Sequence, residues 1–386
     1  MSSSASLNLA RAVRRIDALA GERLPTQRLV EEIAAELHTA MPIDTLLMAA
    51  TDPDTLLALG AGVVHGMPHT VCAPFWEYEF EVPDFNKFSD LARGPRQIAD
   101  LHAATGGRPE RSARWRELRT LMDADAELRA TFNAGGRGWG FLHMNRGGTT
   151  RGFGDEEIAF VEKIAPIVGR ALRLSLISHP AQSAAARGPG MAIVDPANRL
   201  VSATPEAVAW FEDLESVRRM PDPVLGLDVP SEIMVAAQEA RARGAGDAGA
   251  VATRTRARTR SGVWLLIHAS PLRSAGGGAA DVAVVIEPAK ASEVAPLIVD
   301  AYELTPREVE VTRALARGLT TNEIAGELHL SRYTVQDHLK SVYEKAGVSS
   351  RGELVAKMFA DHYHDGLVAA VSGAAPAAAA TVAAAA

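Results

Sequence analysis

The sequence lacks several features, and each absence excludes a class of protein. It has one cysteine, Cys72, in 386 residues, which excludes an intrachain disulfide and favours a reducing compartment such as the cytoplasm. No apolar run approaches the roughly 18 residues of a membrane-spanning helix, so we expect no membrane partner. The N-terminal segment MSSSASLNLARAVRR lacks a continuous apolar core, so a signal peptide is not expected.

Patterns typical of catalysis and metal binding are missing as well. The chain has no P-loop, no G-x-S-x-G element and no convincing catalytic triad. His65, His69 and Cys72 are close in sequence, but these three residues alone do not indicate a metal or redox site. The other histidines are not spaced as metal ligands. We therefore expect no enzymatic activity, no metal and no cofactor.

What the chain does have is an ordinary globular composition and the length of several domains. Hydrophobic residues make up 47% and charged residues 23%, as in soluble globular proteins. A length of 386 residues is typical of two or three domains. Low-complexity sequence is confined to residues 371–386, an Ala-rich tail for which we expect disorder.

Residues 304–360 carry several helix start signals in close succession. Thr305–Glu308 and Thr320–Glu323 are capping boxes, in which the threonine hydroxyl and the glutamate carboxylate each bind a backbone amide of the first turn. Ser331 can cap a helix over 332–346 that ends at Gly347, and Ser350 with Glu353 forms a third box. The segment is therefore predicted to form four short helices.

The third of these helices has two chemically different faces. Val335, Leu339, Val342 and Ala346 recur at helical spacing and are predicted to face a core. The opposite face carries polar residues: Tyr333, Gln336, Asp337, Lys340, Ser341 and Glu344. Gln, Lys and Asp can pair with the exposed edges of adenine, guanine and cytosine, respectively. An ordinary solvated helix face is the alternative, and the four-helix context argues against it.

This block resembles the C-terminal domain of LuxR/GerE-type transcriptional regulators. The resemblance is carried by LTPRE, ARGLTTNEIA, LSRYTVQDHLKSVYEKAGV and SSRGELVA. It implies a helix-turn-helix whose third helix enters the major groove of double-stranded DNA and whose fourth helix forms a dimer. Many relatives have a basic residue where this chain has Gln336 or Asp337.

The resemblance implies specific DNA-contacting residues. Base contacts are expected from Gln336, Asp337 and Lys340. The resemblance also implies contacts with the DNA backbone from Thr334 and Lys345. Further backbone contacts are expected from Arg332 and, through the amides of a helix N-terminus, from Thr320, Thr321 and Asn322. Between residues 304 and 363 there are eight Lys/Arg and eight Asp/Glu, so the block is neutral. Because phosphate attraction supplies most non-specific affinity, we expect weak non-specific binding and dependence on a homodimer.

Two units are predicted before this block. The first, residues 5–178, opens with helices near 7–20 and 26–39, followed by strands near 42–50 and 71–80 with an apolar segment at 62–64 between them. A hairpin over 127–145 then precedes a long helix. The hairpin RGWGFLHMNR and this helix resemble the end of a GAF domain. The resemblance implies a sheet that encloses a ligand pocket.

The second unit, residues 189–288, is predicted to contain strands at MAIVD and RLVSA, a helix capped by Thr204, a polar helix near 231–243, and three more strands. This order resembles a shortened PAS domain. Residues 289–303 are predicted to form a linker helix before the DNA-binding block at 304–364. The expected fold is therefore multidomain α+β with an all-α C-terminal domain.

Some features leave alternatives open. Arg254, Arg256, Arg258 and Arg260 alternate along a strand and share one face, which is either a solvated sheet face or an anion or DNA patch. Five residues of the first unit either pack in its core or line a pocket: Trp76, Tyr78, Trp115, Trp139 and His143.

The expected function is sequence-specific transcription regulation controlled by the two sensory units. A small-molecule effector and RNA polymerase are further possible partners. The alternative is a sensory scaffold that acts through small-molecule or protein contacts and binds DNA weakly.

Overall fold

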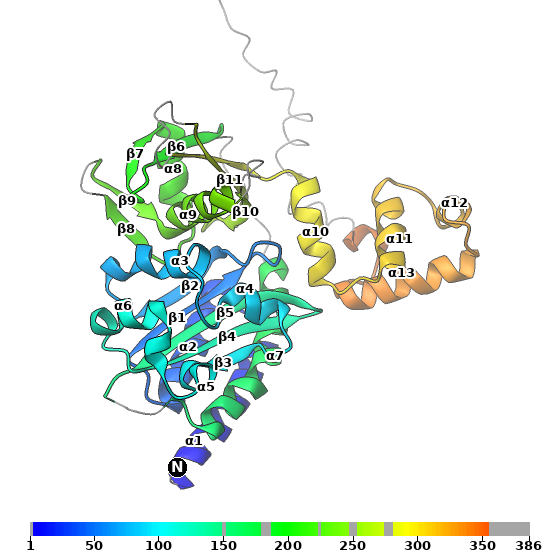
Figure 1. The fold of residues 1–386 in the computed structure, drawn as a ribbon. Coiled ribbons are helices and arrows are strands. Elements are labelled where there is room, and N and C mark those ends of the chain that lie inside the picture. The colour runs from blue at the N-terminus through cyan, green and yellow to red at the C-terminus, as the bar shows by residue number, and fades with distance from the viewer. Residues whose placement is uncertain are drawn as a thin grey trace, which may run out of the picture.

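A computed structural model of the chain describes residues 3–148, 152–178, 187–222, 225–246, 253–273 and 281–354. Figure 1 shows two sheet-containing units, the first in blue and cyan and the second in green. A helical C-terminal domain in orange projects to one side of them. The Ala-rich tail and most of the fourth predicted C-terminal helix lie outside the described residues.

The first unit is built on an antiparallel sheet with the strand order β2-β1-β5-β4-β3. Its strands are β1 (Thr45–Thr51), β2 (Ala58–His65), β3 (Ile98–Asp100), β4 (Ala126–Ala134) and β5 (Arg137–Arg146). The predicted hairpin is confirmed: Gly135 and Gly136 have φ of 59° and 75°, the left-handed conformation that a tight β4–β5 turn requires. The strand expected near residues 42–50 begins at Thr45, and the apolar segment at 62–64 belongs to β2.

Both faces of this sheet are buried. Along β1, Leu46 and Met48 pack in one core with helices α1 (Ser3–Gly21), α2 (Thr26–Ala40) and α7 (Asp155–Ser178). Leu47 and Ala49 point the other way because side chains alternate along a strand. That second face is covered by shorter helices: α3 (Cys72–Phe80), α4 (Phe88–Arg93), α5 (Leu101–Thr105) and α6 (Ala113–Met122), with 3-10 turns at His69–Val71 and Pro109–Arg111.

The strand predicted over residues 71–80 is wrong, because this segment is the helix α3. Its buried residues Phe75, Trp76 and Glu79 follow helical spacing rather than strict alternation. Pro74 lies in the first turn, where a missing N–H removes no helical hydrogen bond. The density of aromatic residues suggested a strand, whereas the position of the proline is compatible with a helix start.

Charged side chains are buried between the first sheet and its short helices. Arg114 donates to both carboxylate oxygens of Glu127, at 3.1 and 2.6 Å, and Arg129 Nη1 lies 2.7 Å from Glu79 Oε2. Burial lowers the pKa of the adjacent His143 to about 3, so its imidazole is neutral. His143 therefore belongs to a buried ion cluster, and Trp139 is fully buried in the core.

The second unit contains another antiparallel sheet, with the strand order β10-β11-β12-β6-β7. Its strands are β6 (Gly190–Val194), β7 (Leu200–Ala203), β10 (Thr253–Arg258), β11 (Trp264–Pro271) and β12 (Val282–Pro288). Helix α8 (Pro205–Asp213) begins after the predicted cap Thr204, whose hydroxyl accepts from the amide of Ala207. A small hairpin of β8 (Arg219–Asp222) and β9 (Leu227–Pro230) was not predicted.

Helix α9 (Ser231–Gly246) corresponds to the predicted polar helix, but it is buried rather than solvated. Ile233, Ala236 and Ala237 are fully buried, and the helix lies between the second sheet and α3 of the first unit. Even its polar residues Glu232 and Gln238 are only 5% exposed. Contacts with both neighbours bury almost its whole circumference, which the sequence of one helix does not reveal.

The arginines of β10 and Arg260, which follows it, make intramolecular contacts instead of forming a free patch. Arg256 Nη1 lies 3.0 Å from both carboxylate oxygens of Asp52 and 3.0 Å from Asp54 Oδ2, on the β1–β2 connection. Arg254 pairs with Glu293, Arg258 Nη1 donates to the Leu176 carbonyl at 3.1 Å, and Arg260 donates to the Glu212 carbonyl. A solvated sheet face is therefore wrong for Arg256 and Arg258, because both hold the two units together.

Helix α10 (Ala291–Ala301) lies within the predicted linker, between the second unit and the C-terminal domain. The domain contains α11 (Pro306–Ala316), α12 (Thr321–Glu327) and α13 (Arg332–Ala346), and a further helical turn is described over residues 351–354. The start of this domain is tied to α7, because Glu303 forms an ion pair with Arg173. In Figure 1, α10 lies between the sheets and the orange domain.

Candidate nucleic-acid interface

Local hydrogen bonds set the ends of the three helices. Complete capping boxes are present at Thr305 with Glu308 and at Thr320 with Glu323, which confirms both predictions. The Ser331 hydroxyl accepts from the Thr334 amide, and Gly347 ends α13 with a φ of 61°. These signals lie within four residues of the helix ends they control, so they were readable from the sequence.

A short turn joins α12 to α13. His329 has a φ of 53°, and the Leu330 amide donates to the Ala325 carbonyl at 2.9 Å. This left-handed residue reverses the chain before Ser331 starts the next helix. The result is a helix-turn-helix with α13 as the second helix, the geometry in which the second helix enters the DNA major groove.

One face of α13 is fixed in the domain core. Val335, Leu339, Val342 and Ala346 are buried, as the helical spacing predicted. Their partners include Ile324 of α12, Leu315 of α11 and Leu354, which are also buried. Because these contacts fix the rotation of α13 about its axis, the opposite face must point away from the domain.

The three residues predicted to contact bases, here called the base-contact face, lie together on that outer surface. Gln336, Asp337 and Lys340 are all exposed. Tyr333, one turn earlier, is 79% exposed, although it is a large aromatic side chain. Within the described residues, no ion pair involves Asp337 or Lys340. The face can therefore offer an amide, a carboxylate and an ammonium group to base edges.

Of the residues predicted to contact the DNA backbone, Lys345 has a different environment. Its Nζ lies 2.6 Å from Glu308 Oε2 and 3.1 Å from the Glu303 carbonyl oxygen. Ser341, also expected on the polar face, donates to Glu308 Oε1 at 2.6 Å. Although burial acts in the opposite direction, these bonds from Lys345 and Ser341 lower the pKa of Glu308 to about 2. In this structure Lys345 therefore anchors α13 to the start of α11.

The remaining predicted backbone contacts lie at the first turns of α12 and α13. Arg332 is exposed, and the Thr334 hydroxyl is 2.8 Å from that of Ser331. At α12, Glu323 accepts from the Thr320 amide at 2.7 Å. This carboxylate already occupies one amide of the helix N-terminus. Thr321 and Asn322 are therefore better placed than Thr320 to bind a phosphate.

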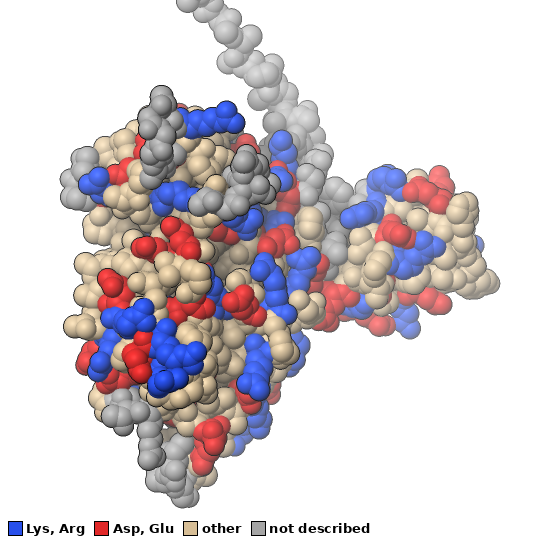
Figure 2. All heavy atoms as spheres, viewed as in Figure 1, with Lys and Arg blue, Asp and Glu red and all other residues tan. Residues whose placement is uncertain are grey.

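The basic residues of the domain divide into two groups. Some are engaged internally: Arg307 with Glu310, Arg317 with Glu327, Lys345 with Glu308, and Arg351 with the carbonyls of Leu315 and Leu319. Among the described residues, Arg313, Arg332 and Lys340 are in no such pair, and two of these three are on α13. Figure 2 shows blue and red mixed over this domain rather than one continuous basic surface.

Within the described ranges, no three His, Cys, Asp or Glu side chains are grouped so that they could hold a metal ion. No helix in those same ranges is long and apolar enough to cross a membrane.

Comparison with known proteins points to the same region. Residues 302–358 match the family described as bacterial regulatory proteins, luxR family. The chain is 51% identical over 53 residues to the probable transcriptional regulatory protein SgaR of Hyphomicrobium methylovorum, which is 14% of this chain and 25% of that protein. It is 42% identical over 55 residues to the spore germination protein GerE of Bacillus subtilis, which is 14% of this chain and 74% of GerE. The chain thus spans only a quarter of the length of SgaR.

A solved structure is similar to part of the remaining chain. The GAF domain of a phosphoenolpyruvate-protein phosphotransferase from Coxiella burnetii covers 44% of this chain and 95% of its own, with 15% identity and a TM-score of 0.30. The PAS-like character of the second unit stays a prediction.

Proposed function

Because this chain belongs, through residues 302–358, to the luxR family of bacterial regulatory proteins, we propose that it is a sequence-specific DNA-binding transcription regulator. The observation that supports this proposal best is the base-contact face. Three side chains that can pair with base edges stand on a helix whose other side is held in a core. The protein acts by binding, in the cytoplasm, and its two sheet-containing units control the C-terminal domain.

Each residue of the base-contact face has a distinct expected partner. Gln336 pairs with adenine through its amide, Lys340 donates to guanine, and Asp337 accepts from the cytosine amino group. Arg332, Thr334, Thr321 and Asn322 bind phosphates on either side, with Thr320 acting through its cap. Lys345 joins them only if its bond to Glu308 opens. RNA polymerase is the proposed downstream partner, and a small molecule the proposed effector.

A homodimer is part of the proposal. The domain is electrically neutral and most of its arginines are engaged internally, so one copy has little attraction for phosphates. Two copies on one DNA double their contacts and bind a site with two-fold symmetry. The fourth C-terminal helix, expected at the dimer contact, lies largely outside the described residues.

The test is a selection of bound DNA from a random pool with the full-length protein. We expect one enriched site with two-fold symmetry. Gln336→Ala should relax the preference at one base of each half-site by about 1–3 kcal/mol, because a bidentate contact is lost. Lys340→Ala should act at a different base. Arg313→Ala is the matched control, since it removes an exposed charge away from the base-contact face.

Three results bear on the proposal in different ways. The proposal is supported if Gln336→Ala and Lys340→Ala each lose base preference at defined positions while the preferences of Arg313→Ala are unchanged. Equal weakening by Lys340→Ala and Arg313→Ala, with no effect of Gln336→Ala, would mean that the protein attracts DNA only through charge. A folded, dimeric protein that enriches no sequence would contradict the proposal and favour a scaffold.

A further inference from the structure

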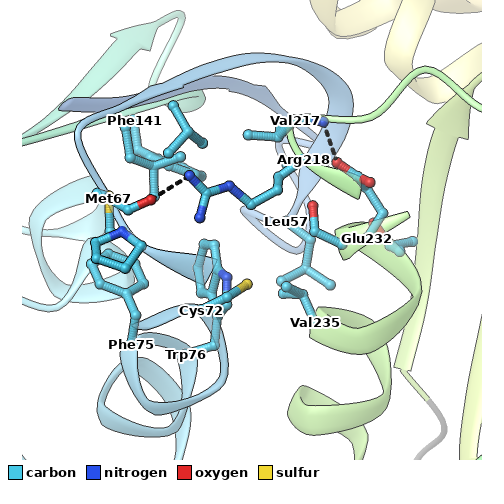
Figure 3. Close-up of a pocket in the computed structure, with 16 residues that line it drawn as sticks. Leu57, Met67, Cys72, Phe75, Trp76, Phe141, Val217, Arg218, Glu232 and Val235 are labelled. Atoms are coloured by element: carbon cyan, nitrogen blue, oxygen red, sulfur yellow. Dashed lines mark hydrogen bonds between the residues drawn. The ribbon is translucent and has the colours of Figure 1, made fainter. Parts of the chain in front are cut away.

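A pocket lies where the first and second units meet. Figure 3 shows the helix α3 on one side and the start of α9 on the other, with side chains from both units pointing into the space between them. Its walls are mainly apolar and include Leu57, Phe75, Trp76, Phe141 and Val235. Both units therefore contribute to one enclosure, and whatever binds there contacts both of them.

One cation enters this apolar enclosure. Arg218 reaches from the second unit across the pocket, and its Nη2 donates to the Met67 carbonyl oxygen at 2.5 Å (Figure 3). Among the described residues, no Asp or Glu lies within ion-pair distance of its guanidinium. Arg218 is partly buried, and burial lowers the pKa of its guanidinium. Guanidinium groups bind carboxylates through two parallel hydrogen bonds. The unused N–H groups of Arg218 thus match an anionic ligand group.

Two other polar groups of the pocket, Glu232 and Cys72, determine how much negative charge an anion would meet there. Glu232 accepts from the Ser216 hydroxyl at 2.6 Å and from the Val217 amide at 2.9 Å, so its oxygens are turned toward the second unit. Burial raises the pKa of Glu232 to about 7, so about half of this group is protonated at pH 7 and nearly all of it at pH 5.5. Burial also raises the pKa of the Cys72 thiol to about 11, so no thiolate is present.

The size of the pocket limits the ligand. Its volume is about 40 Å³, room for about three water-sized groups. An apolar cavity that holds benzene is larger, at about 150 Å³. A carboxylate on Arg218 with a chain of one or two carbons among Leu57, Phe75 and Trp76 is the ligand nearest to this size, whereas an aromatic ring is much larger.

We propose that this pocket binds short-chain aliphatic monocarboxylates, such as acetate and propionate, and that the bound acid is the effector. The binding site stands on its own geometry, whereas its regulatory consequence rests on the proposed DNA-binding function. Because the acid contacts both units, it favours the arrangement in which they are closed on one another. It can shift DNA affinity only by the difference in its affinity for the two arrangements.

Binding is measured by calorimetry on the full-length protein with propionate as the probe. A ligand this small is expected to bind no tighter than about 10 µM. Propionamide, which has the same shape without the charge, and benzoate, which is too large, should bind much more weakly. Arg218→Gln should weaken propionate binding about 10- to 100-fold, as expected for a lost charge-assisted hydrogen bond. Arg199→Gln, which removes an exposed arginine of the same unit, is the control.

A second variant changes the shape of the pocket and keeps Arg218. Ala58→Val adds two methyl groups in β2 at the pocket wall, and valine suits a strand. It should weaken propionate more than acetate, because the longer chain needs the filled space. Circular dichroism confirms that each variant is folded.

The proposal is overturned if neither acetate nor propionate binds, if propionamide binds as well as propionate, or if Arg218→Gln has no effect. DNA selection is scored separately. If propionate binds but does not change the affinity for the selected DNA site, the pocket is a carboxylate site and the acid is not an effector. Absence of DNA selection would leave the calorimetric result intact.

Discussion

Glu232 is an acid whose ionisation changes on folding. It is the second residue of α9 and is 5% exposed, and burial raises its pKa from 4.5 to about 7. The folded protein therefore binds more protons than the unfolded chain between these two values. It follows that the contribution of Glu232 to stability is fully present below pH 4.5 and is lost as pH rises through 7.

Glu232→Gln should remove this dependence. The wild-type protein is expected to lose roughly 3 kcal/mol from this group between pH 4.5 and pH 9, whereas the variant loses none of it. Melting temperatures of both proteins at pH 5, 7 and 9 measure the difference. Glu239→Gln, on the same helix, is the control. Parallel pH profiles for wild type and Glu232→Gln would show that Glu232 ionises normally.

The role of a residue could be predicted when its contacts lie close to it in the sequence. The buried stripe Val335–Ala346 was predicted because helical spacing alone defines it. The role of Lys345 could not be predicted, because its partner Glu308 is 37 residues away and already had a local role as a capping residue. The base-contact face stays a prediction until DNA is bound.

At the scale of elements, α12 is the helix most dependent on its cap. It has seven residues, and an isolated helix of this length is unstable in water. Thr320→Ala removes the hydroxyl that accepts from the Glu323 amide and should cost about 1 kcal/mol of local stability. Amide hydrogen exchange in the full-length protein should then be about fivefold faster in α12 and unchanged in the sheets.

The adjacent threonine provides a matched control. Thr321 follows the cap and has no capping bond, so Thr321→Ala should leave exchange in α12 nearly unchanged. Equal effects of the two substitutions would mean that the cap is not what stabilises α12.

Elements with local signals were predicted better than elements defined by their environment. Caps and glycine turns marked the helices of the C-terminal domain and the β4–β5 hairpin. The helix α3 was mistaken for a strand, because a short segment rich in aromatic residues fits both structures. The burial of α9 arises from packing against both units, and no pattern within α9 reports it.

At the scale of the whole molecule, ion pairs link three parts of the chain. Arg256 of β10 contacts Asp52 and Asp54 of the first unit. Arg137, at the start of β5, contacts Asp54 at 2.5 Å and Asp300 of α10 at 3.2 Å. Although burial acts in the opposite direction, hydrogen bonds from Arg137 and Arg256 lower the pKa of Asp54. The network thus connects the second unit, the first unit and the linker helix before the DNA-binding domain.

Arg256→Met should break this network at its most buried pair. Asp52 is 1% exposed, and burial already raises its pKa against the effect of Arg256, so without that partner it is left as an uncompensated buried acid. Removing one partner of a buried pair costs about 3–5 kcal/mol. Calorimetry of the full-length protein should show the first unfolding transition several degrees lower, because the contact between the units is lost first.

The double variant Arg256→Met/Asp52→Asn tests whether the unpaired charge of Asp52 causes the loss of stability in Arg256→Met. It should regain part of the lost stability, since no unpaired charge remains in the contact. Arg199→Met, which breaks the exposed pair with Asp195, should cost no more than about 1 kcal/mol. If the double variant is as unstable as Arg256→Met and Asp52→Asn added together, the two residues act independently. The units would then be held together by apolar contacts between α3 and α9, and the linker would receive no signal through this network.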